Sequence, residues 1–186
     1  MTKILVTGGL GFIGSNFILF YLKNNSKIQI TNVDACLTGS NSKNLNELKN
    51  SKRYKFIKSN IKNQKIIDEL VSKNDLIINF AAESHVDRSI SNPKLFLDTN
   101  IIGTYSILEA IRKYDKKLVQ ISTDEVYGSL EKNSADENFI LNPSSPYSSS
   151  KASADLLVKS YNITYGCDVK ISRCTNNYGP RQFPEK

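Results

Sequence analysis

Short apolar runs alternate along this chain with longer stretches in which apolar residues recur at helical spacing. Continuous runs rich in Ile, Leu and Val predict strands at residues 3–7, 28–33, 54–57, 76–80, 118–122 and 169–173. Helical spacing predicts helices through residues 17–22, over 42–50 and 64–72, from Pro93 to about Tyr114 and from Pro146 to about Tyr165. The polar stretches 37–41 and 129–143 are expected to be loops. Strands that are apolar on both faces and separated by helices indicate a doubly wound parallel sheet with helices on both faces, an α/β fold of the Rossmann type.

Length and composition place the chain among ordinary globular proteins. Its 186 residues suffice for one well-cored domain, and its apolar and charged fractions are 39% and 23%. No stretch approaches the roughly 20 apolar residues of a membrane span, and the N-terminus lacks the apolar core of a signal peptide. We therefore expect a cytoplasmic protein with no membrane partner.

The formal net charge of +7 comes from scattered lysines. Over residues 43–73 they alternate with Asn, without an Arg cluster or interleaved aromatic residues. A surface that binds nucleic acid would concentrate its basic charge on one face. We therefore expect a solvated, lysine-rich surface and no nucleic-acid partner.

Cysteine and histidine usage argues against a metal site. Cys36, Cys167 and Cys174 form no C-x-x-C pair, and His85 is the one histidine of the sequence. A zinc site needs a larger set of such ligands, so we expect no metal and predict free thiols. His85 could serve as a catalytic base, but a lone histidine is more often a structural hydrogen-bonding residue, and we rank that role first.

A glycine-rich turn follows the first predicted strand. Gly8, Gly11 and Gly14 have the spacing G-x-x-G-x-x-G and open the first helix. Glycine permits a tight turn, and the amide groups of a helix N-terminus bind a pyrophosphate. Asp34 ends the second strand 20 residues after Gly14, where a carboxylate can accept both hydroxyl groups of an adenosine ribose and would repel a 2′-phosphate. Together they predict NAD rather than NADP; a structural turn and a capping Asp are the alternative.

A Tyr-x-x-x-Lys pair lies on the last predicted helix. Tyr147 and Lys151 are four residues apart and therefore share a face. A neighbouring ammonium group lowers the pKa of a phenol, so we expect Lys151 to bring the pKa of Tyr147 towards neutrality and make it a usable base. A solvated pair on the helix surface is the ordinary alternative.

Polar residues follow the fifth predicted strand at its carboxyl end, where this fold binds ligands. They include Ser122, Thr123, Asp124 and Glu125. Ser122 or Thr123 could hydrogen-bond a substrate hydroxyl. Adjacent carboxyl groups can divide acid and base work when their environments separate their pKa values. A charge pair at a helix N-terminus explains Asp124 and Glu125 equally well.

Five stretches together resemble the dTDP-glucose 4,6-dehydratases, which are extended short-chain dehydrogenase/reductases. They are TGGLGFIGSN (residues 7–16), FAAESHVDRSI (80–90), STDEVYG (122–128), PSSPYSSSKASA (143–154) and NNYGPRQFPEK (176–186). The second and third are far more specific than the glycine loop, and epimerases of the same superfamily usually lack the Asp-Glu pair. The resemblance spans the whole chain.

The resemblance implies a dehydration in which NAD oxidises the C4 hydroxyl of the sugar, water leaves across C5 and C6, and the hydride returns to C6. It makes Tyr147 the base at C4, assisted by Thr123 and Lys151. Glu125 would then remove the C5 proton and Asp124 would protonate the departing C6 hydroxyl. The implied cofactor contacts are Gly8, Gly11, Phe12, Ile13, Gly14, Asp34, Asn60, Ile61, Ala81, Ala82, Ser84, Thr99, Tyr147, Lys151 and Asn177.

The same resemblance implies the partners. Ser84, Thr123 and Asn176 would contact the nucleotide sugar, dTDP-glucose. The two long helices would pair with those of a second copy, which predicts a homodimer. Two departures concern the cofactor: Ala35 stands where the family has Lys, and Asn60-Ile61 where it has Asp-Ile beside the adenine. Asn60 can still hydrogen-bond an adenine amino group, so we expect NAD binding to survive these departures in weakened form.

Family members continue well beyond the last residues of this sequence. We therefore expect an NAD-binding Rossmann domain over residues 1–174 and the start of a truncated substrate-binding region over 175–186, with most of the substrate domain absent. Binding of the remote nucleotide positions the reacting sugar, so this chain alone should turn over little dTDP-glucose. The alternatives are another nucleotide-sugar enzyme, such as a UDP-sugar 4,6-dehydratase or 4-epimerase, and an inactive NAD-binding fragment.

Overall fold

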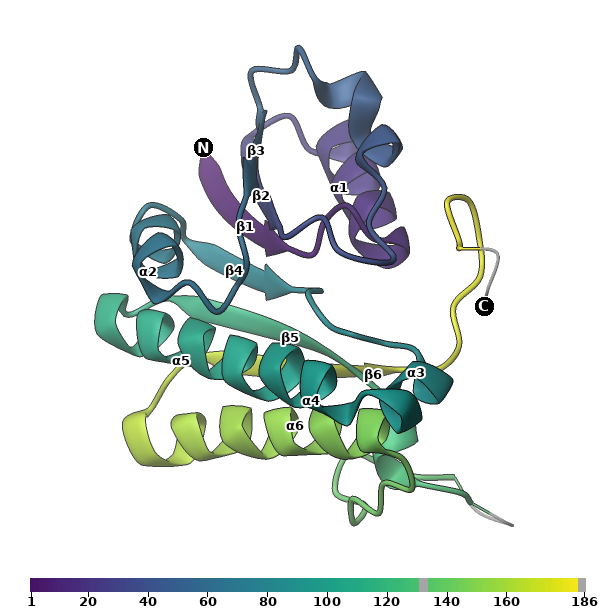
Figure 1. The fold of residues 1–186 in the computed structure, drawn as a ribbon. Coiled ribbons are helices and arrows are strands. Elements are labelled where there is room, and N and C mark those ends of the chain that lie inside the picture. The colour runs from purple at the N-terminus through teal and green to yellow at the C-terminus, as the bar shows by residue number, and fades with distance from the viewer. Residues whose placement is uncertain (131–133, 184–186) are drawn as a thin grey trace.

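The six predicted apolar runs form the strands of one parallel sheet. The computed structural model describes residues 1–130 and 134–183 (Figure 1). Its strands are β1 (Thr2–Thr7), β2 (Ile28–Asp34), β3 (Tyr54–Lys58), β4 (Leu76–Asn79), β5 (Lys117–Thr123) and β6 (Val169–Cys174). Every predicted strand is confirmed to within one residue at each end, and the Rossmann-type fold is confirmed with it.

The strand order β3-β2-β1-β4-β5-β6 creates a switch point beside β1. Thr7 at the end of β1 pairs with Val33 of β2 on one side and with Asn79 of β4 on the other. The chain builds outward from β1 in one direction and then crosses over to build outward in the other. Ligands of doubly wound sheets bind outside the carboxyl strand ends at such a point.

Helices cover both faces of the sheet (Figure 1). They are α1 (Phe12–Asn24), α2 (Gln64–Ser72), α3 (Val86–Ser91), α4 (Pro93–Phe96), α5 (Gly103–Tyr114) and α6 (Pro146–Tyr165), with the 3₁₀-helices η1 (Ser42–Leu48) and η3 (Asp124–Tyr127) and the π-helix η2 (Leu97–Ile102). Within the described residues, no helix combines the length and apolar character that crossing a membrane requires.

The two largest hydrophobic clusters lie one on each face of the sheet. Ile4 and Val6 pack with residues of α1 and η1. Leu5, between them, packs on the other side with residues of α2, α5 and α6. This alternation follows from the pleat of a strand, which turns successive side chains to opposite faces.

The last long helix has the predicted bounds because both of its ends are specified locally. Ser145 and Ser148 form a capping box, and Pro146 occupies the first turn. Gly166 ends α6 in the left-handed region at φ +69°, which glycine adopts without steric cost. Propensity and capping therefore fix the helix that carries Tyr147 and Lys151.

Other elements differ from the prediction. The helix expected from Pro93 to Tyr114 contains the π-helical segment η2, an irregularity that the spacing of apolar residues does not reveal. The short helix predicted over 42–50 is present as the 3₁₀-helix η1 and ends at Leu48. The short helices α3 and η3 were not predicted, since six and four residues carry little periodicity. Of the expected loop 129–143, residues 131–133 lie outside the described residues, and the described remainder contains no helix or strand.

The segment that follows β6 returns to the first half of the chain. Residues 175–183 form no helix or strand and run towards α1, as the yellow end of the ribbon shows (Figure 1). Asn16 of α1 donates its side-chain amide to the carbonyl oxygen of Pro180 over 2.8 Å, and Arg181 donates Nε to the carbonyl oxygen of Asn44 over 3.2 Å. Residues 184–186, part of the expected substrate region, lie outside the described residues.

Candidate active site

A row of buried side chains links the carboxyl ends of β1 and β4 to the middle of β5. Thr7 of β1 donates its hydroxyl to Asn79 Oδ1 of β4. Asn79 Nδ2 then donates to Gln120 Oε1 of β5 over 2.8 Å. All three residues are buried. The loops that follow β1 and β4 are therefore attached to strands whose ends are linked by side-chain hydrogen bonds.

The glycine loop has the conformation that its residue types predict. Gly8 has φ +69°, and a Cβ there would lie 2.6 Å from backbone atoms of Ala81. A Cβ at Gly14 would lie 2.6 Å from the carbonyl oxygen of Gly8. Gly11 precedes α1, and none of the described side chains caps that helix. Its first amide groups, at Phe12 and the exposed Ile13, are therefore available to an anion. The loop therefore fits a pyrophosphate.

Asp34 anchors the glycine loop from the end of β2. Its Oδ2 accepts the amide of Leu10 over 3.0 Å, and its Oδ1 accepts the amide of Cys36 over 2.8 Å and the hydroxyl of Ser40 over 2.7 Å. A carboxylate offers about four acceptor positions. The arrangement therefore leaves room for about one bond from a ribose hydroxyl, where the sequence analysis expected two.

Asn60 and Ile61 follow β3, at the expected adenine side. Asn60 Oδ1 accepts the amide of Lys62 over 2.9 Å and shapes the turn. Ile61 is buried in the core cluster and presses against Gly103, so its side chain has a packing role. Of the two, only the half-buried Asn60 presents a polar side chain near the surface.

Four further predicted cofactor contacts follow β4 or lie in η2. Ala81 and Ala82 are half-buried, and the amide of Ala81 donates to the hydroxyl of Thr7 over 3.3 Å. Ser84 is exposed, whereas Thr99 is buried in η2. The backbone of Ala81 therefore lies directly beside Gly8, where a side chain larger than a methyl group would crowd a cofactor.

The structure brings the predicted acid–base residues together. Thr123 caps η3, because its Oγ1 accepts the amide of Glu125 over 3.2 Å. Asp124 and Glu125 both lie in the first turn of η3, so the predicted charge pair at a helix N-terminus is present. Tyr147 hydrogen-bonds Thr123 and lies close enough to Glu125 and Asp124 for their charges to shift its pKa. Asp124 and Glu125 therefore lie at a helix N-terminus and close to Tyr147 at the same time.

The electrostatics of Tyr147 are opposite to those predicted. Burial, and next the carboxylate of Glu125, raise the pKa of Tyr147 to about 12, against a smaller lowering by the hydrogen bond with Thr123. The ammonium group of Lys151 donates instead to the carbonyl oxygen of Ile121 over 2.6 Å. The prediction that Lys151 brings this phenol towards neutrality was therefore wrong for the residues described, because the lysine is turned to the β5 backbone.

Lys151 itself is buried within the protein. Burial lowers its pKa to about 8, and the carboxylate of Asp155, one helical turn further along α6, opposes that lowering. Lys151 is 4% exposed. Tyr147 is buried as well. The alternative interpretation, in which Tyr147 and Lys151 form a solvated pair on the helix surface, is therefore excluded.

Asn100 is a part of the site that the sequence analysis missed. Its Oδ1 accepts the amide of Glu83 over 2.9 Å, and its Nδ2 donates to the carbonyl oxygen of Glu83 over 3.0 Å and to Ser150 Oγ over 2.8 Å. Ser150 donates in turn to the carbonyl oxygen of Tyr147, and Ser89 accepts the Tyr147 amide. Asn100 lies in η2, and π-helical segments are frequent at functional sites.

Cys174 is the second residue missed. It pairs with Thr123 in the β5–β6 register, and its Sγ donates to the carbonyl oxygen of Ser122 over 3.4 Å. Its charge would act on both Tyr147 and Lys151. The three cysteines are free, as predicted, but the sequence carried no signal that one of them borders the site.

Two predicted residues lie at the edge of the site. Asn177 donates to the carbonyl oxygen of Thr175 over 2.9 Å and to the Cys174 sulfur over 3.4 Å. Asn176 is exposed on the same segment. Nδ1 of His85 is buried without a hydrogen-bond partner among the described residues, so the structural hydrogen bond expected for His85 is not found at that atom.

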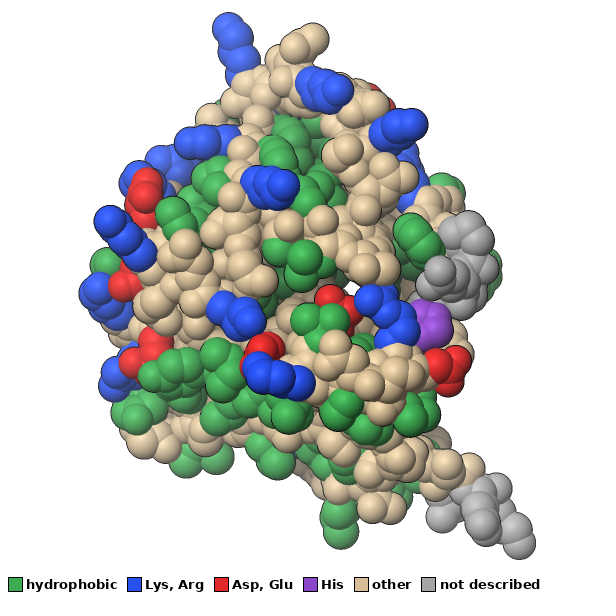
Figure 2. All heavy atoms as spheres, in the orientation of Figure 1, with side chains coloured by type: hydrophobic (Ala, Val, Ile, Leu, Met, Phe, Trp, Pro, Cys, Tyr) green, Lys and Arg blue, Asp and Glu red, His purple; other side chains and the backbone are tan. Residues whose placement is uncertain are grey.

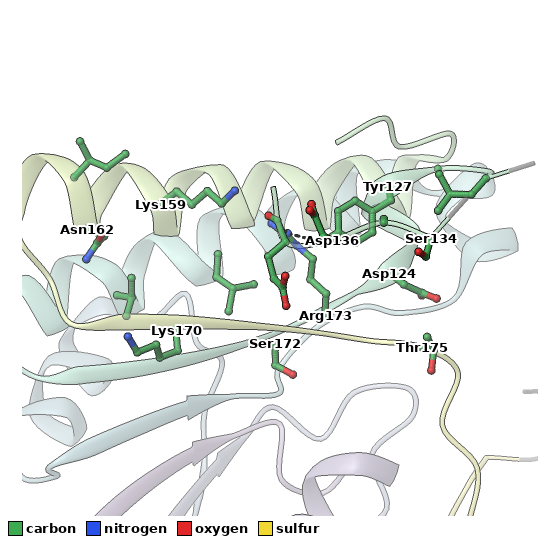
Figure 3. Close-up of a pocket in the computed structure, with 17 residues that line it drawn as sticks. Asp124, Tyr127, Ser134, Asp136, Lys159, Asn162, Lys170, Ser172, Arg173 and Thr175 are labelled. Carbon is green, nitrogen blue, oxygen red and sulfur yellow. Dashed lines mark hydrogen bonds between the residues drawn. The ribbon is translucent and has the colours of Figure 1, made fainter. Parts of the chain in front are cut away.

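A pocket of about 970 Å³ lies along β6 (Figure 3). Asp124 and Thr175 line its end near the site, and Lys159 and Asn162 of α6 line the other end. Asp124 therefore faces an open volume on the side of β6.

The chain is similar over nearly its whole length to a known protein family and to curated relatives. The family model described as GDP-mannose 4,6 dehydratase matches residues 5–186. A dTDP-glucose 4,6-dehydratase of Actinoplanes is 44% identical over 99% of this chain and 59% of its own length. The chain thus spans less than two thirds of that relative.

Solved structures give the same result. The Bacillus anthracis dTDP-glucose 4,6-dehydratase in complex with NAD has a TM-score of 0.91 and 46% identity, over 100% of this chain and 58% of that one. The Streptomyces venezuelae dTDP-glucose 4,6-dehydratase, solved with NAD bound, has a TM-score of 0.95 and 40% identity over 100% of this chain and 59% of that one. The resemblance predicted from the motifs is therefore confirmed.

Proposed function

The chain belongs to the GDP-mannose 4,6 dehydratase family, and from this premise we propose that it binds NAD and dehydrates dTDP-glucose to the 4-keto-6-deoxy sugar. The observation that carries the proposal is the convergence of Asp124 and Glu125 on Tyr147. A dehydrogenase needs one proton acceptor at the oxidised carbon. Elimination of water needs a second base and an acid, which the paired carboxyl groups provide.

The dinucleotide would lie across the switch point. The uncapped N-terminus of α1 and the glycine loop would hold its pyrophosphate, and Asp34 its adenosine ribose. The negative charge of Asp34 favours NAD over NADP. Bound NAD would supply the hydride acceptor at C4 and the hydride donor at C6, together with a positive charge that lowers the pKa of a neighbouring phenol.

Tyr147 would accept the proton of the C4 hydroxyl. The described residues hold the phenol protonated at neutral pH, since burial and Glu125 raise its pKa to about 12. Its function as a base therefore depends on added positive charge in the site. Thr123 orients the phenol by its hydrogen bond, and Lys151 would bind the nicotinamide ribose.

Glu125 and Asp124 would carry out the elimination. The C4 ketone acidifies the C5 proton, which Glu125 removes, and Asp124 protonates the departing C6 hydroxyl so that water leaves. The hydride that leaves C4 would return to C6 while Glu125 returns a proton to C5, so the net reaction is loss of one water molecule. Ser84, Thr123 and Asn176 would contact the sugar.

A nucleotide-sugar 4-epimerase is the second candidate. It would use Tyr147 and Lys151 in the same way but would need neither Asp124 nor Glu125. The acid pair therefore favours the dehydratase. Mass spectrometry of the product decides, because an epimerase leaves the mass of the sugar unchanged.

The decisive experiment uses a hybrid, because this chain covers 58% of the Bacillus anthracis dehydratase. Residues 1–183 are fused to the remaining part of the Bacillus anthracis dehydratase, and C5 deuterium exchange is measured in D₂O. We expect exchange in the hybrid and its loss in Glu125→Gln, with NAD still bound. Glu69→Gln, on the exposed face of α2, is the matched control. Retained exchange in Glu125→Gln would remove Glu125 from the role of base.

We also propose a homodimer through α5 and α6. One stripe of exposed or half-exposed positions runs along α6 at intervals of four and three residues, a spacing typical of helix–helix packing. This α6 seam consists of Ser149, Ser153, Leu156, Ser160 and Ile163. Leu156 and Ile163 are 57% and 83% exposed, and Ile102 at the end of η2 and Tyr105 in the first turn of α5 are exposed as well. Figure 2 shows hydrophobic side chains gathered low on this face, over α5 and α6, whereas Lys and Arg are scattered.

The biological setting is also a proposal. We place the protein in the cytoplasm, where free thiols such as Cys36 persist and nucleotide sugars are made. Its product would feed deoxysugar synthesis, such as that of dTDP-rhamnose for polysaccharides.

A further inference from the structure

A buried ion pair joins α6 to β6. Asp155 Oδ2 accepts Arg173 Nε over 2.8 Å, and the two side chains are 0% and 9% exposed. None of the described residues hydrogen-bonds Asp155 Oδ1 or Arg173 Nη2. None of the roles assigned above uses either residue.

The same guanidinium reaches η3. Arg173 Nη1 donates to the hydroxyl of Tyr127 over 2.8 Å and also contacts the carbonyl oxygen of Glu137 at 3.4 Å (Figure 3). Its central carbon lies 5.1 Å from the centre of the Tyr127 ring. Tyr127 is the last residue of η3 and is buried.

The turn η3 is too short to hold its own geometry. It has four residues, and Asp124 and Glu125 occupy its first half. Its first end is fixed by the Thr123 cap. At its other end Val126 and Tyr127 are buried, the carbonyl oxygen of Val126 accepts the amide of Asn142 over 3.0 Å, and Tyr127 has the polar side-chain contact with Arg173. A short 3₁₀ turn has poor internal hydrogen bonds, so such outside contacts decide its position.

Asp155 connects Arg173 to the helix that carries Tyr147 and Lys151. It lies four residues after Lys151 and eight after Tyr147, so the three share one face of α6. Its carboxylate acts on Lys151. Arg173 therefore bridges the helix with the Tyr–Lys pair and the turn with the acid pair.

Stability gives little reason for this arrangement. A buried ion pair costs desolvation that its attraction often only offsets, and apolar replacements of similar volume are frequently neutral or stabilising. The two unpartnered polar atoms add to that cost. A directional fork that contacts two elements at once is what a positioning function requires.

We propose that Arg173 is a positioning residue that, through Tyr127 and Asp155, holds the Asp124–Glu125 turn against Tyr147. The inference rests on the proposed function for the meaning of that geometry. The geometry itself can be tested on the chain without substrate, because the pKa of Tyr147 reports how closely Glu125, and less strongly Asp124 and Cys174, surround it.

The test replaces all tyrosines with 3-fluorotyrosine, which lowers phenol pKa values so that ¹⁹F NMR can follow the titration before alkaline unfolding. The Tyr147 resonance is assigned with Tyr147→Phe. Glu125→Gln serves as the reference, because it gives the fall in the Tyr147 pKa when the charge of Glu125 is lost completely. We expect Tyr127→Phe and Arg173→Lys to produce at least half of that fall. Tyr161→Phe, which removes a buried phenol hydroxyl that donates to Glu109, should leave the Tyr147 pKa unchanged.

Three results would contradict the inference: an unchanged Tyr147 pKa in Tyr127→Phe, an equal fall in Tyr161→Phe, or no fall in Glu125→Gln. Urea midpoints of all variants separate a local displacement of η3 from a general loss of stability. Arg173→Lys is used because it keeps the positive charge beside Asp155, so that the variant folds. A wild-type hybrid without dehydratase activity would count against the proposed function only, since the titration needs no sugar.

Discussion

At the scale of single residues, backbone geometry and burial decide what each position can be. Gly8 and Gly166 have the same φ of +69°, but a Cβ at Gly8 would meet backbone atoms of Ala81 at 2.6 Å, whereas a Cβ at Gly166 would meet nothing within 4 Å. The two positions therefore separate the conformational cost of a side chain from its steric cost.

We predict that Gly166→Ala costs about 1–2 kcal/mol, the strain of a left-handed residue with a Cβ. Gly8→Ala should cost at least about twice as much, because Ala81 backbone has to move as well. Urea unfolding of both variants measures the difference. Gly8→Ala should also lose NAD affinity in calorimetry, while Gly166→Ala retains it; equal costs would contradict the close approach at Ala81.

Lys151 provides a test by pH. Its pKa is about 8 in the folded protein against 10.5 for a free lysine, so the unfolded chain binds more protons between those values and stability must rise with pH there. Below about pH 8 both states are protonated and the full cost of burial remains. Relative to Lys151→Met, the wild type should gain about 2.5 kcal/mol in unfolding free energy between about pH 7 and pH 10. Lys159→Met, at an exposed position of the same helix, should show no such gain.

The acid–base residues show the limit of reasoning from single positions. The sequence singled out Tyr147, Lys151, Asp124 and Glu125, and the fold brings the tyrosine and both acids together. The expected effect of Lys151 on Tyr147 was wrong, since four-residue spacing fixes a shared face and not the direction in which an ammonium group points.

At the scale of elements, ends are specified better than interiors. The bounds of α6 follow from Ser145, Pro146 and Gly166, which act through local backbone chemistry. The interior of the preceding helix contains η2, which turns Asn100 towards Glu83 and Ser150 and was not predicted. Local rules act within a turn, whereas η2 is stabilised by these distant partners.

Removing the cap of α6 should therefore destabilise the helix that carries the Tyr–Lys pair. Ser145 Oγ accepts the amide of Ser148 over 3.1 Å, and Ser148 Oγ accepts the amide of Ser145 over 3.0 Å. We expect Ser145→Ala to lower the unfolding free energy by about 1 kcal/mol. Ser144→Ala, at the exposed neighbouring position, should stay within about 0.5 kcal/mol of the wild type. Thermal and urea unfolding check both, and equal effects would show that the cap is unimportant.

At the scale of the whole molecule, the strand order makes the site. The order β3-β2-β1-β4-β5-β6 brings the ends of β1 and β4 and the middle of β5 into one buried hydrogen-bonded row, from Thr7 through Asn79 to Gln120. The segment after β6 then returns to α1 through Asn16 and Pro180. Neither contact is visible in local sequence.

The proposed dimer gives a prediction at the same scale. Leu156→Asp or Ile163→Asp places a charge in the α6 seam, so we expect monomers in sedimentation velocity at concentrations where the wild type is a dimer. Phe20→Asp is the matched control, because Phe20 of α1 is 67% exposed but lies on another helix. A wild-type monomer, or an equal effect of Phe20→Asp, would contradict the proposed interface.

The sequence by itself determined the strands, the bounds of α6, the glycine loop and the identity of the acid–base candidates. These depend on side-chain periodicity, capping and allowed φ values, which act over a few residues. Only the tertiary structure decided the pairing of Arg173 with Asp155, the place of Cys174 beside the site and the raised pKa of Tyr147. Each depends on burial and on charges brought together from distant parts of the chain, and no local pattern encodes them.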